Sequence, residues 1–94
     1  MTKHENEIIR RAMKKYGLER QLGMLVEEAA EVIQASMKYL NKRVTSPEAL
    51  ISEIADLSNM IDQMALVWGE EIVRVKAEKL LRLEAKMDDE EGKG

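Results

Sequence analysis

The chain has 94 residues, the size of one domain, and a chain this short buries too little surface to be very stable alone, so an oligomer is expected. Its 15 basic and 18 acidic residues give a net charge of −3, which argues against a dedicated DNA-binding protein, because such proteins usually have a basic excess. There is no cysteine, which excludes disulfides and thiolate metal sites, and the 45% of hydrophobic residues with a single proline favour an all-α fold.

The N-terminal segment predicts a short amphipathic helix. Thr2 and Glu5 have the spacing of a capping box, and Gly17 marks the end of the helix. Apolar residues recur between them at helical spacing, namely Ile8, Ile9, Ala12, Met13 and Tyr16. The first residues are polar and no apolar run approaches the roughly 18 residues of a membrane span, so we expect a cytoplasmic protein that does not enter membranes.

Two long helices are expected in the middle of the chain. The first runs from about Leu18 to about Lys42, and its apolar stripe comprises Leu22, Leu25, Val26, Ala29, Val32, Ile33, Ser36, Met37 and Leu40. The second begins at Ser46-Pro47, with serine as N-cap and proline in the first helical position, and it ends at Trp68 before Gly69. Its stripe comprises Leu50, Ile51, Ile54, Leu57, Ser58, Ile61, Met64, Ala65 and Trp68. The short polar connection predicts that the two helices pack antiparallel.

A fourth helix is expected from Glu70 and Glu71 onward, where acidic residues suit a helix N-terminus. Lys76, Lys79 and Arg82 form a basic stripe along it. Residues 1–87 thus form one helical domain, and residues 88–94 are predicted to be a charged, disordered tail. Apolar residues off the main stripes are expected in the subunit interface of a homodimer or homotetramer, namely Val67, Val75 and Leu83.

The most informative pattern is a pair of acidic motifs on the two long helices. Glu28 and Glu31 are three residues apart, as are Glu53 and Asp56, so each pair lies on one helical face. If the helices pack antiparallel, four carboxylates converge, and their repulsion should raise at least one pKa when no metal is bound. Oxygen ligands of this kind suit Mg²⁺, with Mn²⁺ as the other candidate.

Three functions are compatible with these acids. The first is metal-assisted hydrolysis of a phosphoryl bond, with Glu27 or Glu28 as the base that takes a proton from water. The second, a di-iron carboxylate site, is disfavoured because such sites need Glu-x-x-His motifs and the only histidine, His4, lies outside both acidic motifs. The third is a non-catalytic acidic helical protein-interaction module, such as an antitoxin or an adaptor subunit.

The motifs Glu-Glu-Ala-Ala-Glu and Glu-Ile-Ala-Asp resemble the E-E-x-x-E … E-x-x-D signature of MazG-like nucleotide pyrophosphohydrolases. That group belongs to the all-α NTP pyrophosphatase superfamily, together with the dimeric dUTPases. Residues 32–52 separate the two motifs, which suits two helices joined by a short loop, and the resemblance extends from about Leu18 to Arg82. The chain is similar to the short single-domain members of the family, and the resemblance implies an oligomeric four-helix MazG-like bundle.

The resemblance also implies an activity and a set of site residues. The activity is Mg²⁺-dependent conversion of an NTP or dNTP to the monophosphate and pyrophosphate. The implied metal ligands are Glu28, Glu31, Glu53 and Asp56, with Glu27 beside them as a second catalytic carboxylate next to Glu28. Lys79 and Arg82 would bind the phosphates, and Asn59 and Gln63, on the Asp56 face, are candidates for contact with ribose or base. The chain lacks the tryptophan-rich segment of many members and is short, so part of the base pocket is expected from a second subunit.

Overall fold

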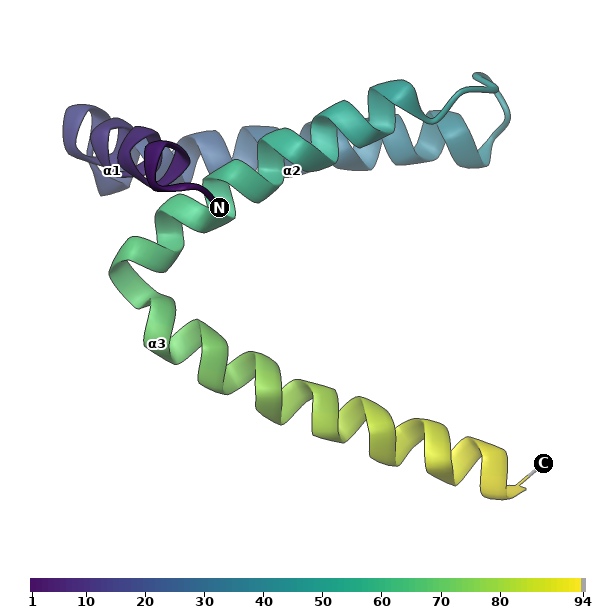
Figure 1. Cartoon of the computed structure of the whole chain (residues 1–94). Helices are drawn as coiled ribbons and strands as arrows, with labels where there is room; N and C mark the ends of the chain where they lie inside the picture. The colour runs from purple at the N-terminus through teal and green to yellow at the C-terminus, as the bar shows by residue number, and fades with distance from the viewer. Residues whose placement is uncertain (94) are drawn as a thin grey trace.

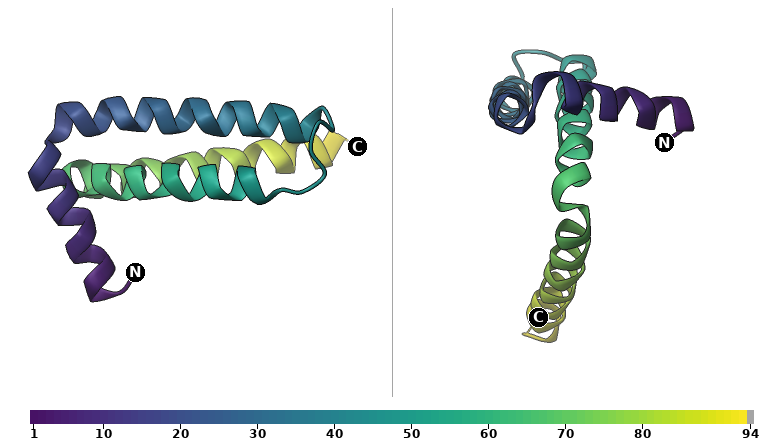
Figure 2. Two further views of the ribbon diagram at one scale, coloured as in Figure 1. Left: turned by 90° about the horizontal axis from the view of Figure 1, so that it is seen from above. Right: turned by 90° about the vertical axis from the view of Figure 1, so that its left-hand side faces the viewer.

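The computed structural model describes residues 1–93, and this part of the chain is all-helical, as predicted. It consists of α1 (Lys3–Tyr16), α2 (Leu18–Leu40) and α3 (Glu48–Lys93). Helices α2 and α3 lie side by side and antiparallel, while α1 crosses them at one end (Figures 1 and 2). Among the described residues, no helix combines the length and the apolar character needed to cross a membrane.

Helix α1 begins and ends where the sequence predicts. The Glu5 N–H donates to Thr2 Oγ1 at 3.0 Å and the Thr2 N–H donates to Glu5 Oε1 at 2.8 Å, so the capping box is formed. The helix stops at Gly17, whose φ of 85° and ψ of 161° belong to a region that only glycine occupies readily. Because α2 starts at the very next residue, this single glycine sets the sharp turn between α1 and α2 (Figure 2).

The connection between α2 and α3 is short and locally determined. Helix α2 ends at Leu40, two residues earlier than expected, because Lys42 adopts a left-handed φ of 59° and the Arg43 N–H donates back to the Lys38 carbonyl at 3.0 Å. Ser46 caps α3 as predicted, since its Oγ accepts from the Glu48 N–H at 3.2 Å. The chain therefore reverses within a few residues, which gives the expected antiparallel pair.

The boundary predicted at Trp68 is found inside α3. Two helical stretches meet there at a kink, where the Trp68 backbone leaves helical angles, with φ of −121° and ψ of 26°. No loop separates the two stretches, so they form one element, α3. Glycine next to the kink is a common cause of such bends. We call residues 69–93 the arm, and α2 with residues 48–68 the hairpin. The arm diverges from the hairpin (Figure 1), so the two parts do not form a four-helix bundle within one chain.

The charged C-terminal segment also differs from the expectation. Residues 88–93 were predicted to be disordered, yet they continue the helix of the arm, and Gly94 lies outside the described residues. The Asp and Glu residues of this segment are good enough helix formers to extend an existing helix by one or two turns, because elongation is far easier than nucleation.

Few side chains of the single chain are buried. Among the apolar residues described, only Ile9, Met60 and Met64 are buried, and Gln21 and Gln63 are buried polar residues. The stripe predicted for α2 is broader than the surface that α3 covers: Leu25 and Val32 are half-buried, but Val26 and Ile33 are 67% and 65% exposed. The exposed members form one apolar face of the hairpin, made of Leu22, Val26, Ile33, Met37 and Leu40 on α2 with Ile51, Ile54, Ile61 and Trp68 on α3.

The chain is more extended than a self-contained domain of its size. Its radius of gyration is 16.9 Å, whereas a compact chain of this length has about 12 Å. Its accessible surface is 7754 Å², whereas a folded monomer of this mass exposes about 5,500 Å². The difference is comparable to the area that one subunit buries in a large, permanent interface.

The turn at Gly17 generates a prediction about stability. Gly17→Ala should destabilise the fold by about 1 to 3 kcal/mol, because a Cβ strains the backbone at this φ and ψ. Gly23→Ala is the matched control: Gly23 lies within α2, where an added Cβ would meet open space, so alanine there should stabilise by about 0.5 to 1 kcal/mol. Urea denaturation of both variants checks the pair, and equal effects would contradict this account of the turn.

Candidate functional site

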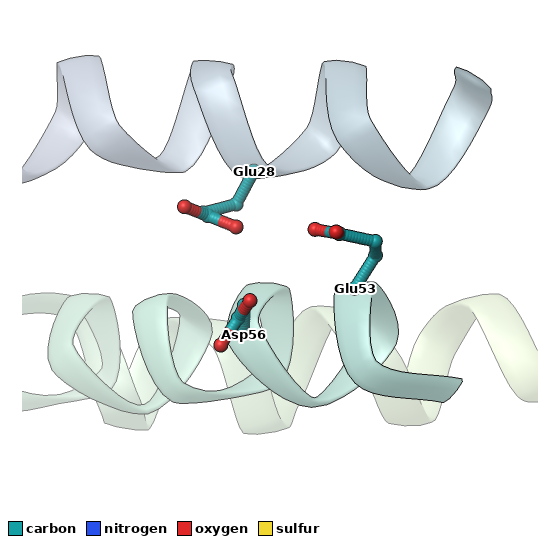
Figure 3. A group of neighbouring side chains, drawn as sticks. All are labelled: Glu28, Glu53 and Asp56. Atoms are coloured by element: carbon teal, nitrogen blue, oxygen red, sulfur yellow. The ribbon is translucent and has the colours of Figure 1, made fainter. Parts of the chain in front are cut away.

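Three carboxylates meet across the contact between α2 and α3. Glu28 projects from α2 toward Glu53 and Asp56 on α3 (Figure 3), and each offers one oxygen such that all three lie within 4.8 Å of one another. Glu28 and Glu53 are half-buried and Asp56 is exposed, so the cluster lies at the edge of the helix contact. We call these three residues the acidic triad.

The triad perturbs the titration of one of its members. The pKa of Glu28 is raised above its ordinary value, first by loss of solvent and then by the negative charges of Asp56, Glu53, Glu31 and Glu27. The sequence-based prediction that crowding would raise at least one pKa is thereby confirmed. The larger cause is the loss of solvent around Glu28, whereas the sequence-based argument considered only repulsion between the acids.

The donor set fits a hard divalent cation. All three groups are carboxylates, which Mg²⁺ and Mn²⁺ prefer over softer ligands. Oxygens bound to Mg²⁺ lie about 3 Å apart when adjacent and about 4.2 Å apart when opposite, so the triad, whose oxygens lie within 4.8 Å of one another, would have to close around a bound ion by movement of its side chains. A cation would also relieve the repulsion that raises the pKa of Glu28.

The other two predicted acids lie beside the triad. Glu31 is exposed and shares the lining of a small cavity of about 110 Å³ with Glu53, formed where α2, the connecting loop and α3 meet. Glu27 is exposed on α2, one residue before Glu28. The negative charges of both residues contribute to the raised pKa of Glu28. The structure therefore brings the predicted acids into one region, although only three of them form the triad.

Gln63 has a structural contact that the sequence did not reveal. Its Oε1 accepts a hydrogen bond from Gln21 Nε2 at 2.7 Å, and both side chains are buried between α2 and α3. Its Nε2 lies 3.6 Å from Met60 Sδ. The pair therefore satisfies two buried amides at once and ties the two helices together, which leaves Gln63 little freedom to bind a ligand.

Asn59 lies in a groove between α1 and α3. The groove has a volume of about 380 Å³, and Asp62 and Gln63 contribute to it beside Asn59. Sequence reasoning missed Asp62, although a signal was present: Asp56, Asn59 and Asp62 are spaced three apart, so polar residues continue from one turn of α3 to the next along a line that winds around the helix. It also missed the contribution of α1, because the order of residues does not show where α1 packs.

Lys79 and Arg82 do not lie with the acids in the single chain. Both are exposed residues of the arm, beyond the kink at Trp68, while the triad lies in the hairpin. The arm runs away from the hairpin (Figures 1 and 2), so any contact of these cations with a ligand at the same chain's triad would require a different arm position or a second chain.

No family model matches the chain, and no curated protein or solved structure shows a significant match to it. Function is therefore inferred from the geometry of the acids and from the motif resemblance.

The raised pKa of Glu28 predicts how stability depends on pH. Between the ordinary pKa of 4.5 and the raised value, the folded state binds more protons than the unfolded state, so the metal-free protein loses stability as pH rises through this window. Glu28→Gln removes that loss. We expect this variant to be more stable than the wild type at neutral pH in EDTA, with the difference vanishing near about pH 3, where both side chains are uncharged.

Urea denaturation at a series of pH values measures this difference. Glu84→Gln on the arm is the control, because Glu84 is an exposed glutamate outside the acidic region and should show no such pH-dependent gain. A Glu28→Gln variant that is less stable than the wild type at neutral pH would contradict repulsion and shielding at this site.

Proposed function

We propose that the protein is a Mg²⁺-dependent nucleoside triphosphate pyrophosphohydrolase, which converts an NTP or dNTP to the monophosphate and pyrophosphate. The observation that carries the proposal is the acidic triad, in which residues of both motifs meet across two helices within 4.8 Å. A solvated acidic surface would not need residues 28, 53 and 56 to meet, and the shielding of Glu28 is unfavourable without a cation. The resemblance to the E-E-x-x-E … E-x-x-D signature supplies the reaction.

The proposed roles follow from the positions of the carboxylates. Glu28, Glu53 and Asp56 would hold Mg²⁺ or Mn²⁺, with Glu31 as a further ligand from the next turn of α2. When bound, the cation would neutralise charge on the phosphates and favour ionisation of the attacking water. Glu27, exposed beside the triad, would accept the proton of that water as its oxygen bonds to the α-phosphorus and pyrophosphate leaves.

We further propose that the chain acts as a homodimer or homotetramer, in which the four-helix bundle is completed between subunits. The apolar face of the hairpin supports this, because Leu22, Val26 and Ile33 are on the opposite side of α2 from Glu28 and Glu31. A second chain can therefore cover the apolar face without covering the acids. Val67 and Leu83 are exposed and Val75 is half-buried, so all three retain surface for such an interface.

Assembly also offers a source of positive charge for the phosphates. Lys79 and Arg82 on the arm of one subunit would bind phosphate oxygens at the triad of another, because the arm of each chain extends away from its own hairpin. The cytoplasm is the proposed place of action, since nucleoside triphosphates are found there, and the net charge of −3 gives no support for DNA as a partner.

One observation favours the alternative of a non-catalytic interaction module. The apolar face and the arm together expose many large hydrophobic side chains, as expected of a chain that binds another protein. This alternative and the hydrolase differ in what they require of the acids, because an interaction module needs neither a cation nor a nucleotide.

The deciding experiment combines metal-dependent stability with pyrophosphate release from a panel of NTPs and dNTPs. At 100 times its dissociation constant, Mg²⁺ should stabilise the wild type by about 2.7 kcal/mol, because it binds only the folded state. In Asp56→Asn both this gain and pyrophosphate release should be lost, while the metal-free stability stays equal or rises, since one repelling charge is removed.

Asp88→Asn provides the matched control, because Asp88 is an exposed aspartate near the end of the arm. This variant should keep both the Mg²⁺-dependent gain and the activity. If Mg²⁺ leaves the wild type unchanged and no nucleotide releases pyrophosphate, the protein is the non-catalytic module instead.

Assembly is tested by sedimentation of two neighbouring variants. The wild type should sediment as a dimer or tetramer at micromolar concentration, and Ile33→Lys should dissociate it, because Ile33 is central to the apolar face. Gln34→Lys introduces the same charge one residue away, outside that face, and should leave the assembly intact. A monomeric wild type would contradict the proposal.

A further inference from the structure

The groove between α1 and α3 has the composition of a small-molecule site. Its volume of about 380 Å³ is in the range of ligand pockets. The N-terminal segment forms one wall, which consists of the apolar side chains Met1, Ile8, Ile9 and Ala12 and of Glu5, whose carboxylate accepts from the Thr2 N–H. The opposite wall is polar and belongs to α3, where Asn59 and Asp62 line the groove. A flat, mostly apolar group with polar edges is the kind of ligand that such a groove fits.

The two polar side chains are available for a ligand. Gln63 is bound to Gln21, but among the described residues neither Asn59 nor Asp62 uses its side chain in a hydrogen bond or ion pair. Asp62 is half-buried, and as an ionised carboxylate it only accepts hydrogen bonds. Asn59 can both donate and accept. The polar wall therefore has more acceptor than donor capacity.

The groove begins one helical turn beyond the acidic triad along α3, because Asn59, which lines it, follows Asp56 by three residues. Asp62 lies about 9 Å beyond Asp56 along the helix axis and about 120° around it. A nucleotide whose phosphates lie near Asp56 would extend its sugar past Asn59 and its base toward Asp62. The apolar wall from α1 would then contact a face of the base.

We propose that this groove binds the nucleobase of the substrate and selects bases that carry an exocyclic amino group, with Asp62 as the residue that determines specificity. The inference rests on the proposed function, since it assumes a nucleotide at the triad. Guanine presents two adjacent N–H donors to a carboxylate, and cytosine and adenine each present an amino group. Uracil has a carbonyl where cytosine has its amino group, and hypoxanthine has only a C–H where guanine has its amino group. A carboxylate at that position therefore disfavours both bases.

The test measures binding of nucleoside monophosphates, which have no pyrophosphate to lose. Chemical-shift titrations with GMP against IMP, and CMP against UMP, compare ligands that differ at the amino position. The wild type should bind each amino-bearing member at least about tenfold more tightly, because the carboxylate is charged. The shifted amides should include Ile8, Ile9 and Ala12, which line the groove.

In Asp62→Asn the ratio of CMP to UMP affinity should fall to about one, because the amide can donate to the uracil carbonyl. The ratio of GMP to IMP affinity should also fall, because a neutral amide oxygen accepts the guanine N–H groups less strongly than a carboxylate does. Asp88→Asn, which makes the same change far along the arm, should keep the ratios. Ala12→Leu fills the groove and should weaken all four ligands without reducing stabilisation by Mg²⁺, which separates loss of the groove from loss of the fold.

Equal affinity within each pair in the wild type, no binding at all, or unchanged ratios in Asp62→Asn would each overturn the proposal. Discrimination that depends on Asp62 without pyrophosphate release from any nucleotide would support the base site and reject the hydrolase. Pyrophosphate release with no discrimination between the paired ligands would support the hydrolase and reject the base site.

Discussion

Repulsion between carboxylates across the α2–α3 contact is the constraint on which the rest of the structure depends. Packing must hold Glu28 near Glu53 and Asp56, and the pKa of Glu28 is raised first by loss of solvent and then by the charges of the neighbouring acids. Met60 and Met64 are the only buried apolar residues among the described residues of the hairpin, so the buried hydrogen bond from Gln21 to Gln63 is an important fixed point. A slip of one helix by a turn would leave both amides unsatisfied and would separate the acids, so the register of the contact and the geometry of the site are maintained together.

Local signals in the sequence predicted the elements well. The capping box of Thr2 and Glu5, the stop at Gly17 and the cap at Ser46 are all found, because each depends on interactions within a few residues. The meeting of Glu28 with Glu53 and Asp56 could be predicted because helical spacing and one short antiparallel connection suffice to place them. The boundary expected at Trp68 is also found, as a kink where the backbone leaves helical angles at that one residue.

What depends on long-range packing was not accessible to the same reasoning. Apolar periodicity identifies the faces of a helix that are covered, but it does not show whether α3 or another chain covers them. Val26 and Ile33 were therefore expected in the core, yet both are exposed in the single chain. The hydrogen bond of Gln63 joins residues 42 positions apart, which no local pattern reveals. The groove beside Asn59 requires knowledge of how α1 crosses α3, and that crossing follows from the backbone angles of Gly17.

The kink at Trp68 also has a mechanical consequence. The arm beyond it is a single helix of roughly 36 Å, so a rotation of about 10° at this residue would move the far end by about 6 Å. A small backbone change at Trp68 would therefore shift the cations and apolar side chains of the arm relative to any neighbouring molecule. In the proposed homo-oligomer, a change at this one position would alter how the arms meet neighbouring subunits and would leave the hairpin and its carboxylates as they are.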